Sequence, residues 1–147
     1  MRGRHKIGFA IYLLVAIMTI AWGLVYLFSS EMMPYHKQAI GKNWADLDRG
    51  VRVIILALME SLGAANITIG FIVLVSLFIP FRRGESWANW TIFLGGIVSG
   101  GLAFLITFKV HLATNASTPW YFMLLFMALI LLGFLFSLGL GKEKIKI

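Results

Sequence analysis

The sequence contains no cysteine and few charged residues, and both absences narrow what the chain can do. Without cysteine there is no disulfide bond, no thiolate metal ligand and no cysteine nucleophile. Only 13% of the 147 residues are charged and 60% are apolar, unlike a water-soluble domain. The glycines at 95–101 lack the Lys and Ser/Thr of a phosphate loop, and no HExxH motif or Ser/His/Asp arrangement is present. These absences favour a membrane protein that is not an enzyme.

Four long apolar runs dominate what remains, and they cover residues 7–28, 53–79, 90–110 and 119–140. A helix of about 20 residues crosses a hydrocarbon core of about 30 Å, so each run can span a membrane. The first run exceeds the 7–15 residues of a typical signal-peptide core and ends in aromatic residues, so we expect it to be retained. The predicted fold class is all-α: a four-transmembrane-helix bundle, with residues 1–147 as a single integral membrane domain.

The net charge of +7 indicates membrane topology rather than nucleic-acid binding, because most basic residues flank the apolar runs. Eight of them fall on one side of the predicted bundle: Arg2, Arg4, Lys6, Arg82, Arg83, Lys142, Lys144 and Lys146. Five fall on the other: Lys37, Lys42, Arg49, Arg52 and Lys109. The positive-inside rule then predicts cytoplasmic N- and C-termini, although an inverted topology stays open.

The segment from Glu31 to Gly50 is the one long connection, and it carries local helix signals. Residues 35–40 predict a short interfacial helix that ends at Gly41. Asn43 is a candidate cap for a turn that carries Trp44 and leads into the second span.

Glu60 and Asn66 are the polar residues of the second run that could serve a ligand. Glu60 lies about two turns inside the run, where an ionisable group is costly unless it is paired, protonated or hydrated. It could contact a ligand, carry a proton or form a structural hydrogen bond or ion pair. Asn66 could bind a ligand, but amides also commonly join membrane helices.

His36, Lys109 and His111 are all predicted at the outer boundary, where with Glu60 they could form a polar mouth. We include His36, Trp44 and His111 with Glu60 and Asn66 as candidate ligand-binding residues. A haem or metal held by the two histidines is disfavoured because neither lies inside a span and the spacing suggests no further ligand. We therefore expect no cofactor and no metal.

Small residues form helix faces in the last two runs. The third run contains Gly95, Gly96, Ser99, Gly100, Gly101 and Ala103, and the fourth has Gly133, Ser137 and Gly141 at four-residue spacing. Such faces favour close helix packing, within the chain, in a homo-oligomer or against a partner membrane subunit, and they can also leave room for a flat ligand.

Three stretches resemble the DoxX-like group of small four-helix bacterial membrane proteins: residues 35–41 with Trp44, residues 60–63 and residues 79–84. The resemblance implies a four-helix membrane fold. Broader four-helix relatives bind sterols through acidic residues in a central cavity, a role for which Glu60 is the intramembrane candidate. A second such acid is missing here, which argues against isomerase-type chemistry.

The leading functional hypothesis is a bacterial inner-membrane bundle that binds a lipid or other hydrophobic small molecule in an outward-facing cavity. An accessory or assembly subunit of a larger membrane complex is one alternative. A proton-coupled small transporter, in which Glu60 changes protonation, is another.

Overall fold

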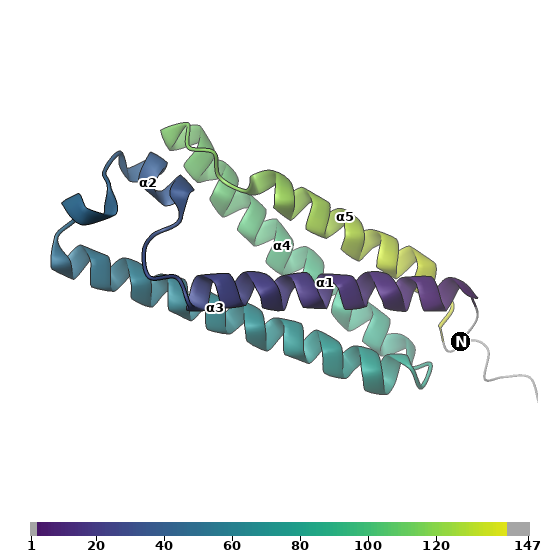
Figure 1. Ribbon diagram of the computed structural model, residues 1–147. Coiled ribbons are helices and arrows are strands. Elements are labelled where there is room, and N and C mark those ends of the chain that lie inside the picture. Colours follow the sequence, from purple (N-terminus) through teal and green to yellow (C-terminus); the bar gives the residue numbers. More distant parts are fainter. Residues whose placement is uncertain (1–2, 141–147) are drawn as a thin grey trace, which may run out of the picture.

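The computed structural model describes residues 3–140 and is helical almost throughout that range (Figure 1). Its elements are the α-helices α1 (Gly3–Leu27), α2 (Pro34–Ile40), α3 (Arg49–Ser76), α4 (Ser86–Thr114) and α5 (Trp120–Ser137), the 3₁₀-helix η1 (Trp44–Asp46) and the π-helix η2 (Leu77–Phe81). Four helical segments are long and apolar enough to cross a membrane: α1, α3 with η2, α4 and α5. The predicted four-span, all-α fold with a short helix between the first two spans is confirmed.

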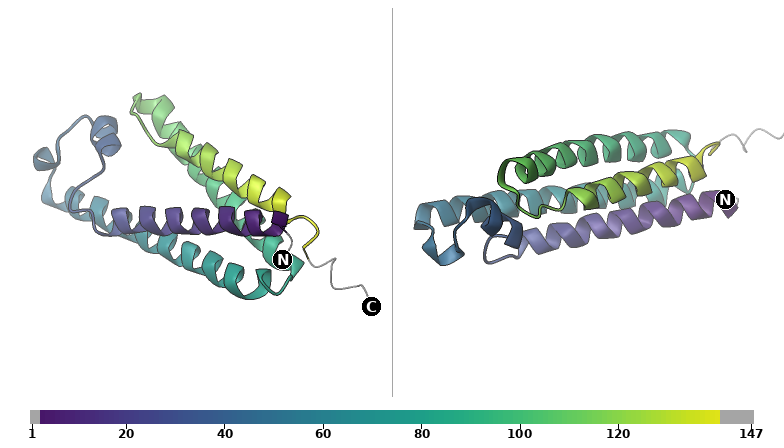
Figure 2. Two further views of the ribbon diagram at one scale, coloured as in Figure 1. Left: turned by 45° about the vertical axis from the view of Figure 1, so that its right-hand side comes forward. Right: turned by 90° about the horizontal axis from the view of Figure 1, so that it is seen from above.

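The spanning helices form two antiparallel pairs, α1 with α3 and α4 with α5, and α1 also packs against α5. The pairs meet at the end of the bundle that holds the start of α1 and the turn at residues 82–85, which we call the terminal end (Figure 1). They diverge toward the opposite end, the loop end, formed by residues 28–48 and 115–119 (Figure 2). Contacts between α3 and α4 are few. The bundle is therefore packed at one end and splayed at the other.

Glycines let neighbouring helices pack closely, with no room for a Cβ atom at the contact. A Cβ added at Gly23 would lie 2.8 Å from the carbonyl oxygen of Gly63, and one at Gly96 would lie 2.8 Å from the Ile130 side chain. A Cβ at Gly133 would lie 2.7 Å from the ring of Tyr12. The expected packing role of small residues is therefore fulfilled inside the chain at Gly96 and Gly133. Gly141 lies outside the described residues.

The second span is longer than a bilayer requires, and α3 extends past the end of α1. Gly63 lies beside Leu27, the last residue of α1, since a Cβ at Gly63 would be 2.7 Å from the Leu27 amide nitrogen. The α3 segment from Arg49 to Gly63 thus projects about 20 Å beyond that level at 1.5 Å per residue. At the other end of this span, Pro80 cannot donate a backbone hydrogen bond, and the chain widens into η2 before the helix ends.

The main apolar core fills the terminal end of the bundle. We call it the terminal cluster; its buried members are Tyr12, Val15, Leu77, Phe81, Ala88, Ile92, Ile130 and Leu140. Within it the Tyr12 hydroxyl donates a 2.8 Å hydrogen bond to Oδ1 of Asn89, which joins α1 to α4. Both side chains are buried, so this bond is shielded from water. Apolar packing and a buried polar bond together hold the two helix pairs at this end.

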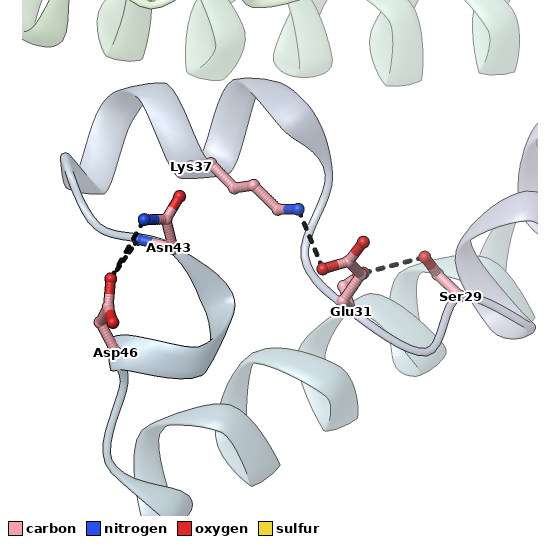
Figure 3. A network of polar contacts seen from close by, with 5 residues as sticks. All are labelled: Ser29, Glu31, Lys37, Asn43 and Asp46. Carbon is pink, nitrogen blue, oxygen red and sulfur yellow. Dashed lines mark hydrogen bonds and ion pairs between the residues drawn. The ribbon is translucent and has the colours of Figure 1, made fainter.

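The loop end has a smaller core and a network of polar contacts. We call its core the loop cluster: Tyr26, Met32, Leu47 and Met59 are buried, with Trp44 and Tyr35 packed against them. Glu31 accepts a 2.9 Å contact from Lys37, and Asp46 accepts hydrogen bonds from the backbone and side chain of Asn43 (Figure 3). The predicted short helix and turn are confirmed: α2 ends at Gly41 in the left-handed conformation, with φ of 71°, and η1 begins after Asn43. The place of α2 at a membrane interface stays a prediction.

Candidate functional site

A cavity of about 370 Å³ lies between the two helix pairs, and we take it as the candidate site. All four spanning helices line it: α1 with Met18, Thr19, Ala21, Trp22 and Val25, α3 with Asn66 and Ile69, α4 with Ser99, Gly100 and Ala103, and α5 with Phe122, Met123 and Phe126. Its volume is within the range of small-molecule pockets, and its wall is mostly apolar with few polar groups, as such pockets usually are.

The cavity exists because the pairs diverge while the facing residues of α4 are small. Gly100 and Ala103 present little side chain toward α1 and α3, so α4 does not fill the widening space. Gly100 is already close to α5, where an added Cβ would lie 2.9 Å from Met127 and 3.2 Å from Phe126. Several wall residues are partly exposed, including Ile69 at 42% and Phe122 at 46%. The cavity therefore communicates with the surface of the bundle.

The cavity lies in the half of the bundle nearer the loop end. Gly23 contacts Ile67 of α3, which places Asn66 close to the level of Gly23, one turn before α1 ends. The wall residues of α5 come from its first two turns, which also face the loop end. If the termini are cytoplasmic as expected, this half is the outer half of the membrane.

Hydroxyl and amide groups supply the polar part of the wall, and most of their donors are already used. Thr19 donates to the Val15 carbonyl at 2.8 Å, and Ser99 donates to Gly96 at 3.3 Å. One N–H of the Asn66 amide donates to the Leu62 carbonyl at 2.9 Å. An amide carries two N–H donors and one acceptor oxygen, so Asn66 has hydrogen-bonding capacity left for a ligand.

Glu60, the other candidate on this helix, does not line the cavity. Its side chain is exposed on the surface of α3, while the neighbouring Met59 is buried in the loop cluster. Glu60 lies three residues before Gly63, so it sits at the level where α1 ends. The cavity wall is therefore formed without Glu60, and a ligand role for this carboxylate stays a prediction.

His36 and Trp44 belong to the loop end, away from the cavity wall. Trp44 packs on the loop cluster. His36 stacks edge-on against Tyr35 with ring centroids 4.3 Å apart, and its Nδ1 is buried without a hydrogen-bond partner among residues 3–140. Burial lowers the pKa of His36 below its ordinary value of 6.5, because desolvation disfavours the charged imidazolium. Trp44 and His36 therefore have packing contacts at the loop end, around α2.

His111 takes part in the connection between α4 and α5. Its Nδ1 lies 2.8 Å from the carbonyl oxygen of Ala116, and its ring lies near Trp120 with centroids 6.1 Å apart. The structure therefore does not bring His36, Trp44, His111 and Glu60 to the cavity with Asn66. Over residues 3–140, no group of three His, Cys, Asp or Glu side chains could hold a metal ion.

The sequence analysis missed most of the cavity wall and the buried Tyr12–Asn89 pair. Met18, Trp22, Phe122 and their apolar neighbours look like any lipid-facing or core residues, so nothing in the sequence marked them. For Asn89 a signal existed, because it directly precedes the predicted third span; α4 starts at Ser86, which draws Asn89 into the bundle. The sequence could therefore have predicted that Asn89, in the first turn of this helix, is buried.

Comparison with protein-family models, curated proteins and solved structures gives no match. The four candidate spans make the chain a multi-pass membrane protein. The basic residues Arg2, Lys142, Lys144 and Lys146, on which part of the topology prediction rests, lie outside the described residues.

Proposed function

We propose that this protein binds a hydrophobic small molecule or lipid in the cavity between its two helix pairs. The observation that supports the proposal is the cavity itself: about 370 Å³, mostly apolar, with the Asn66 amide on its wall. A membrane-embedded cavity of this composition is disfavoured for a water-soluble substrate, because the apolar wall offers no replacement for its lost hydration. Lipid or another hydrophobic compound can fill it without that cost.

The proposal does not involve catalysis. Asn66, Thr19 and Ser99 provide no acid, base or activated nucleophile at the cavity. The proton-coupled transporter loses its main support, because the exposed Glu60 is not on the cavity wall. The cavity supports binding, storage or presentation of a hydrophobic compound.

Filling the cavity tests the proposal. Ala103 lies on the wall, so Ala103→Phe should occupy the space, whereas Ala64→Phe places the same side chain on the exposed surface of α3. We expect native mass spectrometry of protein released from native lipid to show a stoichiometric hydrophobic adduct on the wild type and on Ala64→Phe, and none on Ala103→Phe. Wild type without any adduct, or equal adducts on both variants, would contradict the proposal.

Association with a partner subunit or a second copy is a secondary proposal that the surface of α4 favours. Cβ atoms added at Gly95 and Gly101 would have no atom within 4 Å, so both glycines leave open surface, while Gly96 and Gly100 are used inside the chain. The two glycines are six residues apart and about 120° from each other around α4, so each allows another helix to approach closely at a separate place. The same mass spectra report stoichiometry, and a monomer throughout would contradict this association.

We also propose that the loop end faces outward and the termini face the cytoplasm of a bacterial inner membrane. The support comes from the sequence, which has eight basic residues in the flanks next to the terminal end against five at the loop end, four of the eight lying outside the described residues. We further propose that the chain is related to the DoxX-like proteins that residues 35–41 and 79–84 resemble. The four-helix architecture supports this relationship.

A further inference from the structure

The polar atoms on the cavity wall indicate which chemical class of ligand fits. The volume of the cavity indicates only the size of the ligand. Thr19 and Ser99 have directed their hydroxyl hydrogens to their own helices. The second N–H of the Asn66 amide is not used by its bond to Leu62, and the indole N–H of Trp22 takes part in no hydrogen bond among residues 3–140. The groups with donors to spare are therefore two N–H groups, on Asn66 and Trp22.

Charge is absent from the cavity wall. None of the lining side chains is ionisable, and the nearest acid along α3, Glu60, is exposed on the outside. A charged ligand group would lose hydration there without gaining a counter-ion, which is strongly unfavourable. A neutral hydrogen-bond acceptor, by contrast, would satisfy the two N–H groups.

The unused donors lie toward the loop end of the wall. Trp22 and Asn66 are near the level of Gly23, one turn from the end of α1. Further toward the terminal end the wall has the apolar Met18 and Phe126, with the hydroxyls of Thr19 and Ser99, whose hydrogens are bonded to their own helices. An amphiphile in this cavity would therefore point its polar group toward the loop end and its apolar part toward the bundle interior.

We propose that the cavity binds an uncharged amphiphile whose carbonyl oxygen accepts hydrogen bonds from Asn66 and Trp22, with its apolar body against Met18 and Phe126. The inference rests on the proposed binding function and specifies its ligand class. The ligand has the same orientation as an amphiphile in the leaflet at the loop end. It can enter from the side, because α3 and α4 make few contacts and the cavity opens to the bundle surface between partly exposed residues.

Four probes of equal chain length separate this chemistry from its alternatives: an alkane, a methyl ketone, a secondary alcohol and a carboxylic acid. Radiolabelled probes would be bound to the full-length protein in nanodiscs at pH 8, with empty nanodiscs subtracted. We expect the ketone to bind about tenfold more tightly than the alkane, a difference of about 1.4 kcal/mol. We expect the carboxylic acid, ionised at this pH, to bind most weakly.

Two independent variants test the donors. Asn66→Leu and Trp22→Phe should each lower the ratio of ketone affinity to alkane affinity about threefold, because the two hydrogen bonds share the expected tenfold difference. Thr68→Val is the matched control: its hydroxyl is exposed on α3 and bonded to the Ala64 carbonyl at 2.9 Å, so ketone binding should not change. Two variants in different helices guard against a folding defect in either one.

The outcomes separate the inference from the function on which it rests. If the alkane binds and the ketone binds no more tightly, or if the acid binds best, the carbonyl inference is overturned while the hydrophobic cavity stands. If the alcohol exceeds the ketone and both variants leave the ketone unaffected, the N–H assignment is overturned. If no probe binds, the proposed function itself is overturned.

Discussion

Replacing Gly63 by alanine should force α1 and α3 apart. The added Cβ would lie 2.7 Å from both the Gly23 carbonyl oxygen and the Leu27 amide nitrogen, and 3.1 Å from the Leu27 Cα. Ordinary contact begins at 3.4 Å, so the helices must separate by about 0.7 Å (3.4 − 2.7). All three atoms belong to the backbone and cannot rotate away. Overpacking of this kind typically costs about 1–3 kcal/mol.

The assay is unfolding of the purified protein in mixed micelles of increasing denaturing detergent, followed by far-ultraviolet circular dichroism. Gly95→Ala is the matched control, because an added Cβ there meets no atom within 4 Å. It should leave stability unchanged or raise it by up to about 1 kcal/mol through helix propensity. If Gly63→Ala is as stable as Gly95→Ala, the close crossing of α1 and α3 does not exist as described.

Two further predictions concern the loop end. Because burial lowers the pKa of His36 below 6.5, the folded loop end binds fewer protons than the unfolded one as pH falls through 6.5. Its stability should be fully present above that pH and decrease on acidification, seen as smaller protection factors of the α2 amides at pH 5 than at pH 7.5 after the exchange rates are corrected for the slower intrinsic exchange at low pH; His36→Gln should abolish the difference. For topology, single cysteines replacing the exposed Ser30 and Ser86 serve as reporters in a cysteine-free chain. An impermeant maleimide on intact cells should label only the Ser30→Cys protein, and the reverse pattern would mean an inverted topology.

The helices and the residues that begin and end them were predictable because they depend on short-range interactions along the chain. Hydropathy located all four spans, and the glycine at 41 and the asparagine at 43 correctly marked the end of α2 and the start of η1. Boundaries were less accurate: α4 begins four residues before the predicted Trp90 and continues four residues beyond Val110. Polar residues such as Ser86 and Thr114 extend a helix past its apolar run, which hydropathy alone does not detect.

The site was only partly predictable, since it depends on how helices are arranged in space. Asn66 was identified because an amide within an apolar run is uncommon, and it does line the cavity. Glu60 was selected by the same logic, but a helical wheel specifies neither how far one helix projects past another nor which flank contacts a neighbour. Gly63 packs against α1 whereas Glu60, about 60° around the helix, is exposed. The wall from Trp22 to Phe126 depends on the angle between two helix pairs, which no local pattern encodes.

The distribution of contacts connects the fold to the proposed function. At the terminal end, the terminal cluster and the buried Tyr12–Asn89 bond fix the two helix pairs together. At the loop end, α2 links the pairs through polar contacts: Tyr35 shares a hydrogen bond with Tyr26 of α1, and Gln38 accepts one of 2.8 Å from the Ser117 amide between α4 and α5. Polar contacts near an interface exchange with water at small net cost, whereas opening the terminal end would separate closely packed helices and break the buried Tyr12–Asn89 hydrogen bond in apolar surroundings. The end that holds the cavity is thus the end with the weaker contacts between the helix pairs, which favours it as the route by which the proposed ligand would enter and leave.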